Sequence, residues 1–119
     1  MTSNSSIAFL ARNGAKIHDI KVSNVVDAFK DYKRRNIADV LGAYYTTGYG
    51  DISSEICLYN FEIENIESSY CKSTILFNDR VKNITIKNAI QNNIDGAVLT
   101  ACDEDEIILI NCKAKSNVV

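Results

Sequence analysis

A five-residue motif recurs at a fixed interval along the C-terminal two thirds of the chain. It reads FEIEN at 61–65, ITIKN at 84–88 and IILIN at 107–111, so that each Asn follows the previous one by 23 residues. An earlier copy, IKVSN at 20–24, precedes the second by 41 residues, which is 23 plus an insertion of 18. Apolar residues at the first and third positions of a repeated motif are typical of short strands in a repeat protein.

The 23-residue offset aligns more of the chain than the motif itself. Apolar residues mostly meet apolar ones: Ile66 meets Ala89 and Cys112, Ile75 meets Val98, and Leu76 meets Leu99. Opposite charges also meet, in the pairs Glu64 with Lys87, Lys72 with Asp95, Arg80 with Asp103 and Lys82 with Asp105. Because neighbouring parallel strands lie about 4.8 Å apart, such pairs favour this register.

The period of 23 residues limits the architecture. Leucine-rich repeats need a Leu pattern that is missing here, and a βαβ unit needs a helical crossover. The return segment 91–99, QNNIDGAVL, is a polar turn followed by a second short strand. We therefore expect one all-β domain over residues 1–119, a single-stranded parallel β-helix of about four rungs. Strands are expected at Ile7–Leu10 and from Ile17 to Val26. Stacked side chains of Asn24, Asn65, Asn88 and Asn111 are expected to form a hydrogen-bonded ladder.

Two segments carry a resemblance to a known family. VKNITIKN at 81–88 and NIDGAVL at 93–99 resemble rungs of the pectate-lyase-like superfamily, which includes pectate and pectin lyases, polygalacturonases and phage tailspike depolymerases. The resemblance covers roughly residues 7–117. It implies a right-handed β-helix that recognises or depolymerises a carbohydrate polymer. The alternative is a non-catalytic structural or adhesive β-helix, such as a tail-fibre shaft or surface protein.

The 18-residue insertion divides into two expected loops, FKDYKRRN at 29–36 and GAYYTTGYGDISSE at 42–55. Insertions in repeat proteins often form loops on the binding face. Tyrosines on a glycine-containing backbone suit stacking against sugar rings, and the basic loop suits an acidic polymer. The predicted substrate-binding residues are Tyr44, Tyr45, Tyr49, Asp51, Arg34 and Arg35. Alternatively, the rings cover the wall of the β-helix and the basic run is solvated.

One carboxylate matches a catalytic motif of the resembled family. Asn93-Ile94-Asp95 has the form of the Asn-x-Asp motif of polygalacturonases, which makes Asp95 a candidate catalytic base. No Asp-Asp pair occurs, His18 lies upstream without flanking glycines, and no Arg-x-Lys follows Asp95. Inverting hydrolysis needs two carboxyl groups about 6.5 to 9.5 Å apart. The choice between hydrolase, lyase and binding protein stays open, and Asp95-Gly96 is also a common turn sequence.

Cofactors and other partners receive little support. The acidic run Asp103–Glu106 suits Ca²⁺ in a lyase, but consecutive residues of a strand diverge, which favours a solvated turn. The cysteines, Cys57, Cys71, Cys102 and Cys112, show no CxxC spacing and the single His is His18, so we expect buried free thiols and no metal. A net charge of −2 gives no argument for nucleic acid or a membrane surface.

The two ends of a short β-helix are expected to determine what it associates with. About four rungs rise only about 20 Å, and both ends expose an apolar cross-section and unpaired strand edges. Terminal repeats usually carry polar caps, and residues 113–119 show none. We therefore expect self-association, or a place within a longer solenoid. No signal peptide or membrane span is predicted, and an extracellular or virion-surface location follows only for a longer secreted or viral protein.

Overall fold

The computed structural model describes residues 5–12, 14–27, 39–46 and 55–115, which form nine strands and one short 3-10 helix. The strands are β1 (Ser5–Arg12), β2 (Ile17–Asp27), β3 (Asp39–Thr46), β4 (Leu58–Ser68), β5 (Ser73–Phe77), β6 (Val81–Gln91), β7 (Ala97–Ala101), β8 (Ile107–Ile110) and β9 (Lys113–Ala114), with the helix η1 at Glu104–Glu106. No helix in these ranges is long and apolar enough to cross a membrane.

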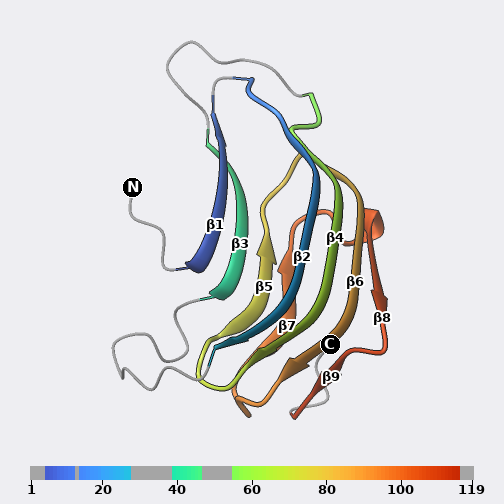
Figure 1. Ribbon diagram of the computed structural model, residues 1–119. Coiled ribbons are helices and arrows are strands. Elements are labelled where there is room, and N and C mark those ends of the chain that lie inside the picture. Colours follow the sequence, from blue (N-terminus) through green and yellow to red (C-terminus); the bar gives the residue numbers. More distant parts are fainter. Residues whose placement is uncertain (1–4, 13, 28–38, 47–54, 116–119) are drawn as a thin grey trace.

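The strands alternate between two sheets. One sheet has the order β1-β3-β5-β7 and the other β2-β4-β6-β8, with β9 also paired to β6. Every pairing is parallel. Figure 1 shows each sheet running in sequence order from its blue strand to its orange or red strand. The chain thus crosses from one sheet to the other and returns one strand further along, as the prediction of parallel strands joined by turns requires.

The long strands of the second sheet bend twice. β2, β4 and β6 each have 11 residues, and the third and eighth residues of each have a left-handed backbone. These residues are Asp19 and Asn24, Asn60 and Asn65, and Asn83 and Asn88, with φ between 56° and 61°. Asn and Asp adopt this conformation more readily than other residues that carry a Cβ. The Asn content of the chain therefore supplies the bends.

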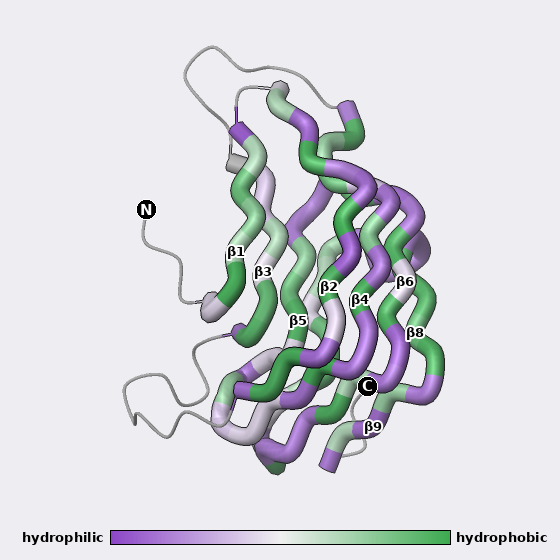
Figure 2. The backbone as a smooth tube through the Cα atoms, in the orientation of Figure 1, coloured by the Kyte–Doolittle hydropathy of each residue, from purple (hydrophilic) through white to green (hydrophobic). Residues whose placement is uncertain are grey.

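Each bend shifts the alternation of side chains by one residue. In β4 the residues before and at each bend point outward together, Tyr59 with Asn60 and Glu64 with Asn65. The inward positions of β4 are Leu58, Phe61, Ile63, Ile66 and Ser68, and those of β6 are Val81, Ile84, Ile86, Ala89 and Gln91. All ten are buried. Figure 2 shows the resulting alternation of apolar and polar residues along the strands.

The core lies between the two sheets. Phe61 of β4 packs edge to face on Phe9 of β1 and on Phe77 of β5, with ring centroids 5.5 and 5.4 Å apart. Such pairs contribute about 0.5 to 1.5 kcal/mol beyond the burial of their area. Phe61 thereby links the two sheets across three strands.

The register confirms the 23-residue period in one sheet and corrects it in the other. β4 and β6 pair with Ile66 opposite Ala89, and β6 and β8 keep the same offset. β5 and β7 instead pair Ile75 with Leu99, an offset of 24, so the predicted alignment of Ile75 with Val98 is wrong by one residue. The reason is the turn 92–96 before β7, which is one residue longer than the turn 69–72 before β5.

Two smaller expectations are also corrected. Glu64 and Lys87 are opposite in the register, but none of the four predicted charge pairs forms an ion pair between described residues. All four cysteines are free thiols, as predicted. Cys57 and Cys71 are buried, whereas Cys102 is exposed because it follows the end of β7, and Cys112 is only partly buried.

Candidate functional site

The predicted tyrosine loop begins later than expected. Residues 42–46 belong to β3, and β3 pairs with β1 so that Tyr45 lies opposite Ala11. The prediction of a loop over 42–55 is therefore wrong for its first five residues, because pairing with β1 extends the strand. Tyr49, Asp51, Arg34 and Arg35 lie outside the described residues.

Tyr44 and Tyr45 both make internal contacts. Tyr45 is only 7% exposed, and the guanidinium of Arg80 lies 3.9 Å from its ring centroid. The Tyr45 hydroxyl and Arg80 Nη1 are buried and have no hydrogen-bond partner among the described residues. The half-buried Tyr44 donates a hydrogen bond to Asp39 Oδ2 at 3.0 Å, and its hydroxyl lies 2.8 Å from Ser5 Oγ. In this arrangement the Tyr45 ring is packed against the core and presents no face to a ligand.

Asp95 lies in the turn between β6 and β7. Its backbone N–H donates to Asn93 Oδ1 at 3.2 Å, and the N–H of Gly96 donates to the Asn93 carbonyl oxygen at 3.0 Å. Gly96 is needed here, because a Cβ would lie 2.6 Å from Gln91 Nε2 and 2.9 Å from the Cys71 carbonyl oxygen. The Asn-x-Asp pattern thus has a structural use, and a catalytic role for the exposed Asp95 stays a prediction.

A groove of about 280 Å³ crosses β2, β4 and β6 on the outer face of the second sheet. We call it the ladder groove. Its lining residues are Asp19, Ile20, Lys21, Asn60, Phe61, Glu62, Asn83 and Thr85. One wall consists of the residues at the first bend of each strand, Asp19, Asn60 and Asn83. The other wall consists of the outward residues two positions later, Lys21, Glu62 and Thr85. Both walls are polar because the apolar residues between them point into the core.

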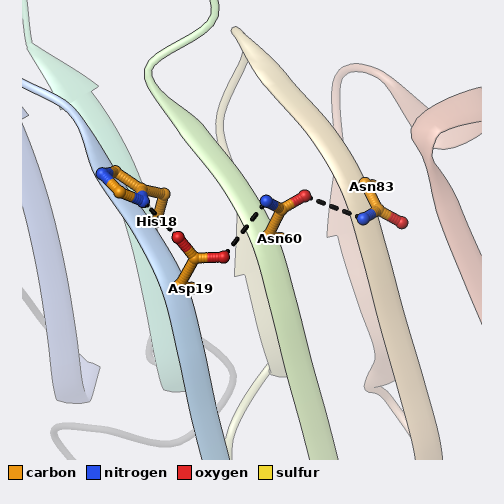
Figure 3. A network of polar contacts seen from close by, with 4 residues as sticks. All are labelled: His18, Asp19, Asn60 and Asn83. Carbon is orange, nitrogen blue, oxygen red and sulfur yellow. Dashed lines mark hydrogen bonds and ion pairs between the residues drawn. The ribbon is translucent and has the colours of Figure 1, made fainter.

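The first wall is a continuous chain of hydrogen bonds (Figure 3). Asn83 Nδ2 donates to Asn60 Oδ1 at 2.8 Å, and Asn60 Nδ2 donates to Asp19 Oδ1 at 3.2 Å. Nδ1 of His18 lies 2.5 Å from Asp19 Oδ2. The His18 ring also stacks on Tyr59, with centroids 4.7 Å apart and planes 5° from parallel. Side chains from three successive strands are therefore held in one row.

Asp19 is the charged end of this row. Its hydrogen bond with His18, and then that from Asn60, lower the pKa of the Asp19 carboxyl. Hydrogen bonds to a carboxylate favour the charged form. Asp19 is therefore ionised at neutral pH, with both oxygens already accepting hydrogen bonds from the protein.

This ladder was not predicted, although the sequence carries a signal for it. Asp19, Asn60 and Asn83 are separated by 41 and 23 residues, the same intervals as Asn24, Asn65 and Asn88. Each copy of the five-residue motif begins one residue after the first bend, so the motif does not include Asp19, Asn60 or Asn83. The residue at position 19 is Asp rather than Asn, which makes the repeat of this column harder to recognise.

The predicted Asn ladder is confirmed at two of its steps. Asn65 Nδ2 donates to Asn24 Oδ1 at 3.1 Å, and Asn111 Nδ2 donates to Asn88 Oδ1 at 2.7 Å. A second groove, of about 320 Å³, runs beside this ladder. Its other side includes Val26 and Ile90, so it offers fewer polar groups than the ladder groove.

The acidic run forms an exposed turn rather than part of a strand. Glu104–Glu106 is the 3-10 helix η1, and none of its residues is buried. Among the described residues, no group of three or more His, Cys, Asp or Glu is arranged to hold a metal ion.

Comparison with known proteins does not assign the chain to a family. No family model, curated protein or solved structure matches it.

Proposed function

We propose that this chain is a segment of a right-handed single-stranded parallel β-helix whose ladder groove binds a carbohydrate polymer without cleaving it. The alternation of the chain between two parallel sheets supports the β-helix. Right-handedness follows from the general rule that about 98% of parallel crossover connections have this hand. The resemblance of residues 81–99 to pectate-lyase-like rungs points to the same architecture.

The regular polar lining of the ladder groove carries the proposal. Lys21, Glu62 and Thr85 form one wall, opposite the ladder of Asp19, Asn60 and Asn83. Successive strands are about 4.8 Å apart, so donors and acceptors repeat along the groove at that spacing. A polymer of hydroxyl-bearing rings lying across the strands meets such groups along its length. An apolar ligand would leave them unpaired, which is costly.

Asp19 favours recognition over hydrolysis. A general acid in glycoside hydrolysis needs a raised pKa, whereas the pKa of Asp19 is lowered and both its oxygens accept hydrogen bonds. The other candidate, Asp95, is not among the residues that line the groove. We therefore assign the groove a binding role.

A matched pair of variants tests this assignment. Glu62 and Glu64 both point outward from β4, but only Glu62 lines the ladder groove. We expect calorimetric titration with a panel of neutral and acidic polysaccharides to find binding. Glu62→Gln should weaken it by about fivefold, the value of one hydrogen bond, and Glu64→Gln should leave it unchanged. No reducing ends should be released. Absence of binding across the panel, or equal losses in both variants, would reject the proposal.

The alternative is a purely structural or adhesive β-helix. It is favoured by apolar residues that remain partly exposed at the two ends of the stack, such as Phe9 and Leu109. A structural segment binds no saccharide, and substitutions at Lys21 or Glu62 leave all its properties unchanged. The titration above therefore separates the two functions.

A further inference from the structure

We infer that copies of this chain associate head to tail, with β2 of one copy pairing in parallel with β8 of the copy before it. The inference goes beyond the proposed function, because it rests on the two edge strands and needs no saccharide.

The apolar core is incompletely covered at both ends of the stack. The partly buried apolar residues that pack against the core all lie in the first two strands or near the last three: Ile7, Phe9, Ile17, Ile20, Val22 and Val25 at one end, and Leu99, Ala101, Leu109, Cys112 and Ala114 at the other. The inward apolar residues of β4 and β6, which have a strand on each side, are fully buried. Exposed apolar area and unpaired strand edges together favour the addition of another strand.

The two edge strands carry the same repeated motif, IKVSN in β2 and IILIN at 107–111. In the register that joins β4 to β6, Ile107 of one copy meets Ile20 of the next, and Leu109 meets Val22. All four side chains point inward within their own copies. Stacking of β2 on β8 therefore extends the core with apolar contacts of the same kind as those inside the chain.

The hydrogen-bonded ladders give this contact a direction. At every ladder step that forms a hydrogen bond, Nδ2 of the later residue donates to the side-chain oxygen of the earlier one. Within the described ranges, Nδ2 of Asn24 and Oδ1 of Asn111 have no side-chain partner. Asn24 of one copy and Asn111 of the copy before it thus supply the missing donor and acceptor.

The other ladder ends within the chain. Asp19 has no amide to donate, and the residue 23 positions after Asn83 is Glu106 rather than Asn. In the head-to-tail register Glu106 approaches Asp19, so salt that screens two carboxylates strengthens the association. Only the column of Asn24 offers a donor and an acceptor to the contact.

A head-to-tail contact between identical copies is heterologous and leads to open polymers unless the rotation closes. A contact between two β2 edges would instead be isologous. It would set the two strands antiparallel and would not bring Asn24 to Asn111. The two kinds of contact are therefore distinguishable with variants that block one edge each.

The test uses sedimentation velocity on the 119-residue chain. We expect its sedimentation coefficient to rise with concentration. Val22→Lys places an inward charge on the β2 edge, and Leu109→Lys does so on the β8 edge. Each variant alone should be monomeric, and an equimolar mixture should form a one-to-one dimer through the two unblocked edges. Circular dichroism melting verifies that both variants are folded.

A third substitution tests the ladder itself. Asn24→Asp, introduced into the Leu109→Lys variant, keeps the oxygen that accepts from Asn65 but loses the donor. Asp19 shows that Asp is compatible with this bend. The dissociation constant of the mixed dimer should rise by at least about fivefold, the value of one hydrogen bond. The neighbouring outward substitution Ser23→Ala should leave it unchanged.

Three results would overturn the inference. A wild-type chain that stays monomeric at all concentrations would mean that its edges do not recognise a second copy. Dimers of either blocked variant alone would indicate an isologous contact. An unchanged dissociation constant for Asn24→Asp would exclude a hydrogen bond between Asn24 and Asn111 across the contact.

Discussion

Asn83 donates a side-chain hydrogen bond to Oδ1 of Asn60, which precedes it by 23 residues, at 2.8 Å. Both residues have a left-handed backbone, with φ of 56° and 58°. Asn accepts this conformation with little strain, and its amide carries both a donor and an acceptor. At these two positions one residue type therefore both bends the strand and joins it to its neighbour. The bend and the register are for this reason coupled along the stack.

Asn60 offers a direct measure of that coupling. Asn60→Ala removes two hydrogen bonds and places a Cβ without polar compensation in the left-handed region, so it should lower the free energy of unfolding by about 2 to 4 kcal/mol. Asn60→Gly loses the same hydrogen bonds without the strain and should cost about 1 to 2 kcal/mol. Urea denaturation at concentrations below self-association gives both values. Equal costs would show that the backbone conformation contributes nothing.

Removal of the hydroxyl should change the stability of the fold in opposite directions at Tyr45 and at Tyr44. The Tyr45 hydroxyl is buried and has no hydrogen-bond partner in the described part of the chain, so Tyr45→Phe should raise the free energy of unfolding by about 1 kcal/mol. The Tyr44 hydroxyl is hydrogen-bonded to Asp39 and Ser5, so Tyr44→Phe should lower the free energy of unfolding by about 1 kcal/mol. Thermal and urea unfolding of the two variants provide the comparison. A loss of stability in Tyr45→Phe would indicate that its hydroxyl has a partner in solution.

Much of the second sheet was predictable from the sequence, because each of its bends needs a particular residue type. Asn65, Asn88 and Asn111 revealed the period, and the alternation at 61–65 revealed the inward face. The first sheet was less predictable. Its offset of 24 between Ile75 and Leu99 depends on the length of one turn, and no side chain in β5 or β7 is tied to a special backbone conformation.

The start of the tyrosine loop was predicted in the wrong place for a physical reason. Gly42, Tyr44 and Tyr45 lie in a glycine-containing stretch that is typical of a loop, but pairing with β1 holds them in a strand. Gly42 is itself a packing residue, since a Cβ there would lie 2.5 Å from the Tyr44 ring. The walls of the ladder groove are ordinary polar residues of strands. Only their alignment across β2, β4 and β6 distinguishes them.

Gln91 should be among the least replaceable polar residues of the interior. It is 1% exposed, its Oε1 accepts from Ser68 Oγ and the Asn93 N–H, and its Nε2 donates to the carbonyl oxygens of Cys71 and Ala97. Gln91→Leu removes all four of these hydrogen bonds and should lower the free energy of unfolding by about 3 to 5 kcal/mol. Asn92→Ala, at the next and more exposed position, should cost about 1 kcal/mol at most. Similar losses in both would contradict the hydrogen-bond assignment.

Asp39 should make stability depend on pH in the direction opposite to most carboxylates. Burial raises the pKa of its carboxyl, while hydrogen bonds from Tyr44 and Ser5 lower it less. Between the unfolded pKa and this raised folded pKa, the folded chain binds more protons than the unfolded one. The Asp39 contribution to the free energy of unfolding therefore falls as pH rises through that window.

Asp39→Asn removes this titration and keeps an oxygen that can accept from Tyr44. The variant should gain stability over the wild type as pH rises from acid to neutral, and the difference should become constant below the unfolded pKa of Asp. Urea denaturation at closely spaced pH values measures the difference, and Asp79→Asn, at an exposed position, serves as the control. Because every other carboxylate is common to both proteins, parallel profiles for wild type and Asp39→Asn would mean that burial does not raise the pKa of Asp39.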